Sequence, residues 1–195
     1  AIALPLHATV RGSSHTAYST ETFTLGAGVF DGIWASNDDA DELGYEVMGK
    51  FTGVEGLTIF AGYAAQESTI GTDSPELFNL WASYKVGDLL LAAEWAETED
   101  LAGTDSETWS LMANYPVNDW LAFTGRYSAI ESEASATGAE TLDAEEFTLA
   151  ALLTVHKNLL VIVEYRTNNV DVGGSDSDVL AVEASAMAEK FLLAV

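Results

Sequence analysis

The chain has 195 residues and carries 31 acidic against 7 basic side chains, a formal net charge of −24. This acidity argues against nucleic acid as a partner, because phosphate backbones require a basic surface. With 48% hydrophobic residues and no cysteine, the composition excludes a disordered coil, a disulfide framework and thiolate metal sites. No run of 18 apolar residues occurs, which excludes a helical membrane anchor, and the length fits one domain over residues 1–195.

Alternation of apolar and polar residues predicts β-strands along most of the chain. Two N-terminal strands are expected at Leu4–Val10 and Thr22–Trp34. Four β-hairpins follow, each with a short turn between two alternating runs. These hairpins cover residues 43–63, 78–95, 109–127 and 147–165. A closing strand is expected at Asp178–Ala186, and residues 187–195 are expected to form an irregular tail.

The second strand of every hairpin begins with an aliphatic residue that is followed, six positions later, by an aromatic one. The pairs are Leu57 and Tyr63, Leu89 and Trp95, Leu121 and Tyr127, and Leu159 and Tyr165. An even offset keeps both side chains on one face of a strand. Each hairpin is therefore expected to have one apolar face with an aromatic residue near its edge.

The connections alternate between short turns and longer polar segments rich in Asp, Glu, Ser, Thr and Gly. The longer segments are Asn37–Glu42, Gln66–Glu76, Thr98–Glu107, Ser132–Ala144 and Asn168–Asp178. Short turns on one side and long loops on the other are typical of outer-membrane barrels. We therefore predict an all-β, antiparallel, up-and-down transmembrane β-barrel of about 10–12 strands with long acidic loops.

The strand count leaves the size of this barrel open. Eleven segments are recognised, whereas single-chain bacterial barrels usually have an even number of strands. Either a further strand lies within Arg11–Thr22 or in the tail, or the chain is part of a larger barrel.

The face opposite the apolar one carries ionisable side chains. Candidate lumen-lining residues are Glu46, Lys50, Lys85, Glu94, Arg126, Glu164 and Arg166. Period-two alternation alone fits both a soluble barrel with this face outward and a membrane barrel with it inward. The membrane interpretation is favoured because aromatic residues lie near the strand ends, as interfacial belts require. These candidate interface aromatics are Tyr63, Tyr84, Trp95, Tyr115, Tyr127 and Tyr165.

The inward charges have two interpretations. They either line a pore, or pairs such as Glu94–Arg126 and Glu164–Arg166 satisfy one another inside the barrel. The histidines are dispersed and no second ligand lies at metal spacing, so no metal site is expected. No nucleophile elbow or phosphate loop occurs, so neither an enzyme nor a cofactor is expected.

The segment from Glu42 to Glu183 resembles Gram-negative porins, in particular the OmpL-like β-barrel porins. The residues that carry the resemblance are LFNLWASYKVGDLLLAAEWAET, FTLAALLTVHKNLLVIVEYRTNNVD and the closing DVLAVEASA. The resemblance implies an outer-membrane location in a Gram-negative bacterium, contact with lipid, and passive diffusion of small solutes. Acidic loops would favour cations. A homo-oligomer, a non-transporting structural or assembly role, and a soluble ligand-binding barrel stay open as alternatives.

Overall fold

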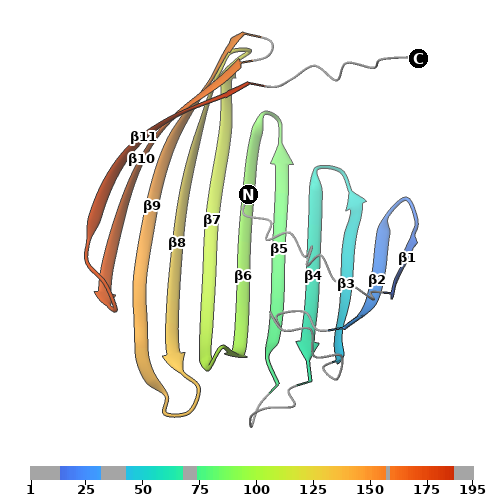
Figure 1. Ribbon diagram of the computed structural model, residues 1–195. Coiled ribbons are helices and arrows are strands. Elements are labelled where there is room, and N and C mark those ends of the chain that lie inside the picture. Colours follow the sequence, from blue (N-terminus) through green and yellow to red (C-terminus); the bar gives the residue numbers. More distant parts are fainter. Residues whose placement is uncertain (1–13, 32–42, 68–73, 157–158, 187–195) are drawn as a thin grey trace, which may run out of the picture.

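The computed structural model describes residues 14–31, 43–67, 74–156 and 159–186, and these form a single antiparallel sheet (Figure 1). The strand order in the sheet is the order in the sequence, so each strand pairs with the next along the chain. The strands are β1 (Ser14–Ser19), β2 (Phe23–Asp31), β3 (Leu43–Val54), β4 (Leu57–Gln66), β5 (Glu76–Val86), β6 (Leu89–Leu101), β7 (Thr104–Asn118), β8 (Leu121–Ala134), β9 (Ala139–His156), β10 (Leu159–Val172) and β11 (Ser177–Ala186). The predicted all-β, up-and-down architecture is confirmed. No helix long and apolar enough to cross a membrane occurs in the described residues.

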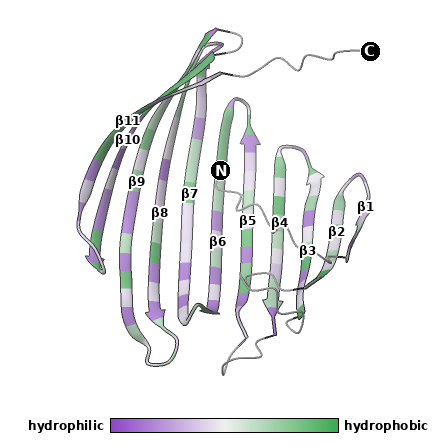
Figure 2. Ribbon diagram, in the orientation of Figure 1, coloured by the Kyte–Doolittle hydropathy of each residue, from purple (hydrophilic) through white to green (hydrophobic). Residues whose placement is uncertain are grey.

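The register keeps the two faces of the sheet chemically separate. On the apolar face Leu80 lies opposite Trp95, and Trp95 lies opposite Trp109. On the other face Trp81 lies opposite Glu94, which lies opposite Ser110. In Figure 2 hydrophobic and hydrophilic residues therefore alternate along the strands. A slip of one residue in any pair would move a whole strand's apolar side chains onto the charged face.

The apolar face is the convex one. Its large side chains are strongly exposed, with Leu111 at 52% and Phe123 at 44%, whereas Thr148 and Ala150 on the polar face are 5% and 6% exposed. The sheet bends from β7 round to β11 (Figure 1), and side chains diverge on the convex side of a bent sheet and crowd on the concave side. A soluble barrel buries its apolar face inward, so this arrangement is the inverted polarity of a membrane barrel.

Tight turns join the strands at one end, which we call the short-turn end. The turns at Gly87–Asp88 and at Asp119–Trp120 have two residues each. Gly56, in the turn between β3 and β4, has φ 76°, and a Cβ atom there would lie 2.4 Å from the carbonyl oxygen of Lys85 on β5. Only glycine fits this close approach of two chain segments.

The opposite end has shorter connections than the sequence indicated. The polar segments predicted as loops at Thr98–Glu107, Ser132–Ala144 and Asn168–Asp178 largely continue the strands, and β6 turns into β7 through Ala102 and Gly103 alone. Their Ser, Thr and Glu side chains alternate and pair across strands, which a sheet exposed to water on both faces tolerates. The expected loop at Asn37–Glu42 lies outside the described residues, and Gln66–Glu76 is described only in part.

At the N-terminal side the first described strand is β1, within the segment where a further strand was considered. The strand expected at Leu4–Val10 and the tail at residues 187–195 lie outside the described residues. β1 and β11 are the two edges of the sheet, and no pairing joins them in the part of the chain that the structure describes.

Two adjacent alanines on β6 test which face meets hydrocarbon. Ala93 lies on the apolar face opposite Ala82, and Ala92 lies on the polar face opposite Ser83. We expect Ala93→Arg to lower the free energy of unfolding in lipid vesicles by about 2–4 kcal/mol, because its charge would enter the bilayer. Ala92→Arg is the matched control and should cost much less. Equal costs in urea unfolding would contradict the assignment of the faces.

Candidate lumen wall and acidic rim

All seven side chains predicted to line a lumen lie on the polar, concave face. They come from β3 (Glu46 and Lys50), β5 (Lys85), β6 (Glu94), β8 (Arg126) and β10 (Glu164 and Arg166). They do not form one cluster. The three on β8 and β10 meet over the C-terminal half of the sheet, whereas Glu94 lies in a different environment on β6.

A network of two arginines and two glutamates, which we call the charge quartet, spans β8 to β10. Arg126 Nη2 lies 2.6 Å from Glu146 Oε1, and Arg166 Nη2 lies 2.7 Å from Glu164 Oε1. Arg166 Nε lies 3.5 Å from Glu146 Oε2, and Thr148 Oγ1 donates a hydrogen bond to Glu146 Oε1 at 3.1 Å. Glu146 therefore bridges both arginines, and the quartet has no net charge.

The expected Glu94–Arg126 pair is wrong, whereas the Glu164–Arg166 pair is present. β7 separates Glu94 from Arg126, and the carboxylate nearest to Arg126 is Glu146 on the adjacent strand β9. Sequence reasoning missed Glu146 because it precedes the first apolar residue of its predicted strand, Phe147. Glu146 lies two and four positions before Thr148 and Ala150 on β9, and this even spacing places it on the polar face.

Glu94 belongs instead to a second polar-face feature, which we call the aromatic row. Lys50, Phe60, Trp81 and Glu94 lie directly opposite one another on the successive strands β3 to β6. The rings of Phe60 and Trp81 stack, with centroids 5.8 Å apart and planes 18° apart. Asn79 Nδ2 donates a hydrogen bond to Glu94 Oε1 at 2.9 Å, which orients this carboxylate.

All six aromatic residues predicted for the interface lie on the apolar face, in two groups. Tyr84 and Tyr115 lie toward the short-turn end. The second group lies further from that end, with Tyr63 near the far end of β4 and Trp95, Tyr127 and Tyr165 at the middle of β6, β8 and β10. The expectation that these three lie near strand ends is wrong, because the strands continue through the polar segments predicted as loops. Sequence reasoning missed their ring partners on neighbouring strands. The ring pairs are Tyr45–Tyr63 at 6.2 Å, Phe78–Trp95 at 5.5 Å and Trp109–Tyr127 at 4.9 Å between centroids.

The aromatic side chains of the second group point toward carboxylates further along the sheet. Hydrogen bonds run from Tyr63 Oη to Glu76 Oε2 at 2.6 Å, from Trp95 Nε1 to Glu107 Oε1 at 2.8 Å and from Tyr165 Oη to Asp178 Oδ1 at 3.1 Å. An aromatic ring with its polar atom directed away from the apolar band is the arrangement found at a membrane–water interface.

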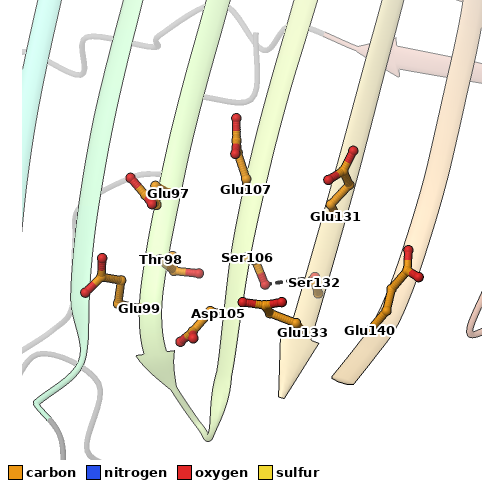
Figure 3. A pocket seen from close by; sticks show the side chains of 10 residues that line it. All are labelled: Glu97, Thr98, Glu99, Asp105, Ser106, Glu107, Glu131, Ser132, Glu133 and Glu140. Carbon is orange, nitrogen blue, oxygen red and sulfur yellow. Dashed lines mark hydrogen bonds between the residues drawn. The ribbon is translucent and has the colours of Figure 1, made fainter. Parts of the chain in front are cut away.

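Beyond these aromatics, β6 to β9 line a shallow cavity of about 530 Å³ (Figure 3). Seven of its ten lining side chains are carboxylates, which we call the acidic rim: Glu97, Glu99, Asp105, Glu107, Glu131, Glu133 and Glu140. Glu97, Glu107 and Glu131 lie directly opposite one another on three strands. Like charges in this position repel, so the rim concentrates negative potential rather than stabilising the sheet.

Asp105 holds the β6–β7 turn. Asp100 and Ala102 have φ values of 49° and 56°, which side chains other than glycine rarely adopt. The Oδ1 atom of Asp105 accepts hydrogen bonds from the Asp100 backbone N–H at 2.6 Å and from the Ser135 hydroxyl at 2.7 Å. Both hydrogen bonds lower the pKa of Asp105 below its ordinary value, and the bond from the Asp100 backbone has the larger effect.

An antiparallel up-and-down sheet that is apolar outside and ionised inside defines an outer-membrane β-barrel protein. A model of the Gram-negative porin family matches residues 9–173. The chain therefore belongs to the Gram-negative porin family, whose place is the outer membrane.

Solved structures show the same fold. A loop-deletion variant of OmpT, an outer membrane protein of Vibrio cholerae, has a TM-score of 0.71 and 19% identity over 89% of this chain and 62% of that one. OmpF of Salmonella typhi, in complex with daunomycin, has a TM-score of 0.70 and 18% identity. The outer membrane channel DcaP of Acinetobacter baumannii has a TM-score of 0.69 and 14% identity. The last two matches cover 89% of this chain and 61% of theirs. A search of curated proteins finds no match.

Removing the carboxylate that bridges the quartet should destabilise the sheet. We expect Glu146→Gln to lower the free energy of unfolding by about 1–2 kcal/mol, since both arginines lose a charged acceptor at a site that is only 23% exposed. Urea unfolding monitored by tryptophan fluorescence measures the change. The control is Glu131→Gln in the acidic rim, which removes a carboxylate from a like-charged row. If Glu131→Gln cost as much, the quartet would have no special stabilising role.

The Asp105 turn should lose stability in acid. Because its folded-state pKa is depressed, the stabilisation is complete above the ordinary aspartate range and is lost as pH falls through the folded pKa. Thermal unfolding midpoints at neutral and acidic pH should therefore differ more for the wild type than for Asp105→Asn, which has no carboxylate to protonate. An identical pH dependence of the two proteins would contradict this role.

Proposed function

We propose that the protein forms a channel for passive diffusion of small solutes and ions across the outer membrane. The observation that carries this proposal is the segregation of charge. Between the two groups of aromatic side chains, the described ionisable groups lie on the concave face, whereas the convex face presents side chains such as Leu91, Leu111 and Phe123. A charged concave wall requires water beside it, and a water-filled lumen is a route for solutes.

The acidic rim supports a preference for cations. Seven carboxylates beyond the second aromatic group raise the local concentration of cations at this end of the barrel and lower that of anions within about 10 Å at 0.1 M salt. Glu97, Glu107 and Glu131 share the outward face of Trp95 and Trp109, so they act at the mouth of the barrel rather than inside its lumen. The charge quartet adds no net charge to this field, so the rim and the unneutralised side chains of the wall dominate the potential. The net charge of −24 acts in the same direction.

We further propose that the eleven strands are part of a larger closed barrel. The chain spans about three fifths of the length of the OmpT, OmpF and DcaP structures described above. In hydrocarbon every backbone N–H and C=O must be paired, so the edges of β1 and β11 require neighbouring strands. The mass of the protein extracted from outer membranes tests this, since a mass close to 20.7 kDa would contradict it.

Planar-bilayer recording of the protein purified from outer membranes tests the channel directly. We expect stepwise currents, because the polar wall provides a hydrated path for ions. A protein that is correctly folded and inserted but gives no current would contradict the diffusion function and favour the structural role. Heat-modifiable migration on gels verifies that the silent protein is folded.

The same recordings in a KCl gradient test the cation preference. We expect a ratio of K⁺ to Cl⁻ permeability above one, which falls about twofold in the double variant Glu97→Gln and Glu131→Gln. At 1 M salt the two proteins should converge, because the screening length shrinks to about 3 Å. A ratio that does not respond to the double substitution at low salt would contradict the role of the acidic rim.

A further inference from the structure

We propose that the aromatic row is a binding subsite on the lumen wall for small amines that carry a flat ring. The ring would stack on Trp81 and Phe60, and the ammonium group would pair with Glu94. This inference rests on the proposed channel function and specifies a class of solute that the wall would hold during passage.

The geometry supplies the two parts of such a subsite side by side. Phe60 and Trp81 are half-buried and their rings stack on each other, so together they form one aromatic pair on the face that carries Glu94. Glu94 lies directly opposite Trp81 on the next strand, about 5 Å away between backbones. A ring and an ammonium group separated by a two-carbon linker span about this distance, so one solute reaches both groups.

The backbone makes room for these rings. Gly62 on β4 lies beside Phe60, and a Cβ atom at Gly62 would lie 3.1 Å from the Phe60 ring. The absence of a side chain lets the ring lie close to the sheet. Because Trp81 stacks on Phe60 on one side, its other side, toward Glu94 on β6, is the one that a solute ring would meet.

The charge balance of the wall distinguishes this row from the quartet. In the quartet two arginines neutralise two glutamates, so a passing solute meets a site with no net charge. Among the described residues no basic side chain pairs with Glu94, whose recorded partner is the neutral amide of Asn79. Glu94 is therefore an oriented anion with its charge uncompensated, which is the complement of an ammonium group.

Lys50 sets the direction in which the solute lies. It lies opposite Phe60, at the end of the row away from Glu94. A cationic group is repelled from that end and attracted to the other, so an amine is held with its ammonium toward β6. A ring-bearing anion would meet Glu94 beside the stacking surface and is disfavoured there.

Current block in planar bilayers tests the subsite on the complete protein. The probes are tryptamine, which has a ring and a positive charge, butylamine, which has only the charge, and indole-3-acetate, which has the ring and a negative charge. We expect tryptamine to block at the lowest concentration. Trp81→Leu should weaken its block about five- to tenfold, the usual strength of one aromatic stacking contact.

Two further variants separate the parts of the site. Glu94→Gln should weaken the block by tryptamine. It should also reduce the difference between the blocking concentrations of tryptamine and indole-3-acetate. Trp109→Leu removes a tryptophan from the opposite, apolar face and should leave the block unchanged. Equal block by tryptamine and butylamine, or an unchanged block in Trp81→Leu, would overturn the proposal. Failure of the channel function would look different, since the wild type would then conduct no current even without an amine.

Discussion

In hydrocarbon, no water is present to satisfy a backbone N–H or C=O group, and this constraint governs the whole structure. The continuous antiparallel ladder from β1 to β11 is the response, because every internal strand is paired on both sides. Once the backbone is paired in this way, alternation of side chains assigns each residue to lipid or to water. The glycine at position 56 and the tight turns at the short-turn end keep neighbouring strands in the register that preserves this assignment.

The charged side chains of the sheet fall into groups with different roles. The quartet on β8 to β10 neutralises its own charges and ties three strands together, so its contribution is to stability. Glu94 on the polar face retains uncompensated negative charge, and so does the acidic rim, whose Glu97, Glu107 and Glu131 lie on the opposite face beyond the aromatic side chains. Such charge costs stability unless solvent or a ligand stabilises it. The structure thus separates the charges that hold the wall together from those that stay uncompensated.

Much of the fold could be predicted from period-two alternation. This pattern is local in sequence, and it predicts the hairpins and their common apolar face. It also predicts the face on which residues such as Arg126 and Lys85 lie. The rim-end turns could not be predicted well, because Ser, Thr and Glu alternate in strands exposed to water as they do in loops. At the rim end, a segment extends a strand only if it pairs with a neighbouring strand, and the sequence of one segment alone does not show that pairing.

Partner choice on the polar face could not be predicted either. Glu94 and Arg126 have opposite charge and the same parity, but an intervening strand separates them, and the actual partner of Arg126 lies on β9. Such pairs depend on strand order, register and side-chain reach together. Likewise, the stacking of Phe60 on Trp81 follows from the β4–β5 register rather than from either strand alone.

The central claim is that the apolar face meets hydrocarbon and the polar face meets water. The chain has no cysteine, so single cysteines at Ala92 and Ala93 can carry nitroxide labels without competing sites. Collision rates with oxygen, which concentrates in lipid, and with a water-soluble nickel chelate then report each label's surroundings in vesicles. The account predicts high oxygen and low nickel accessibility at position 93 and the reverse at position 92. The opposite pattern, or equal accessibilities at both positions, would contradict it.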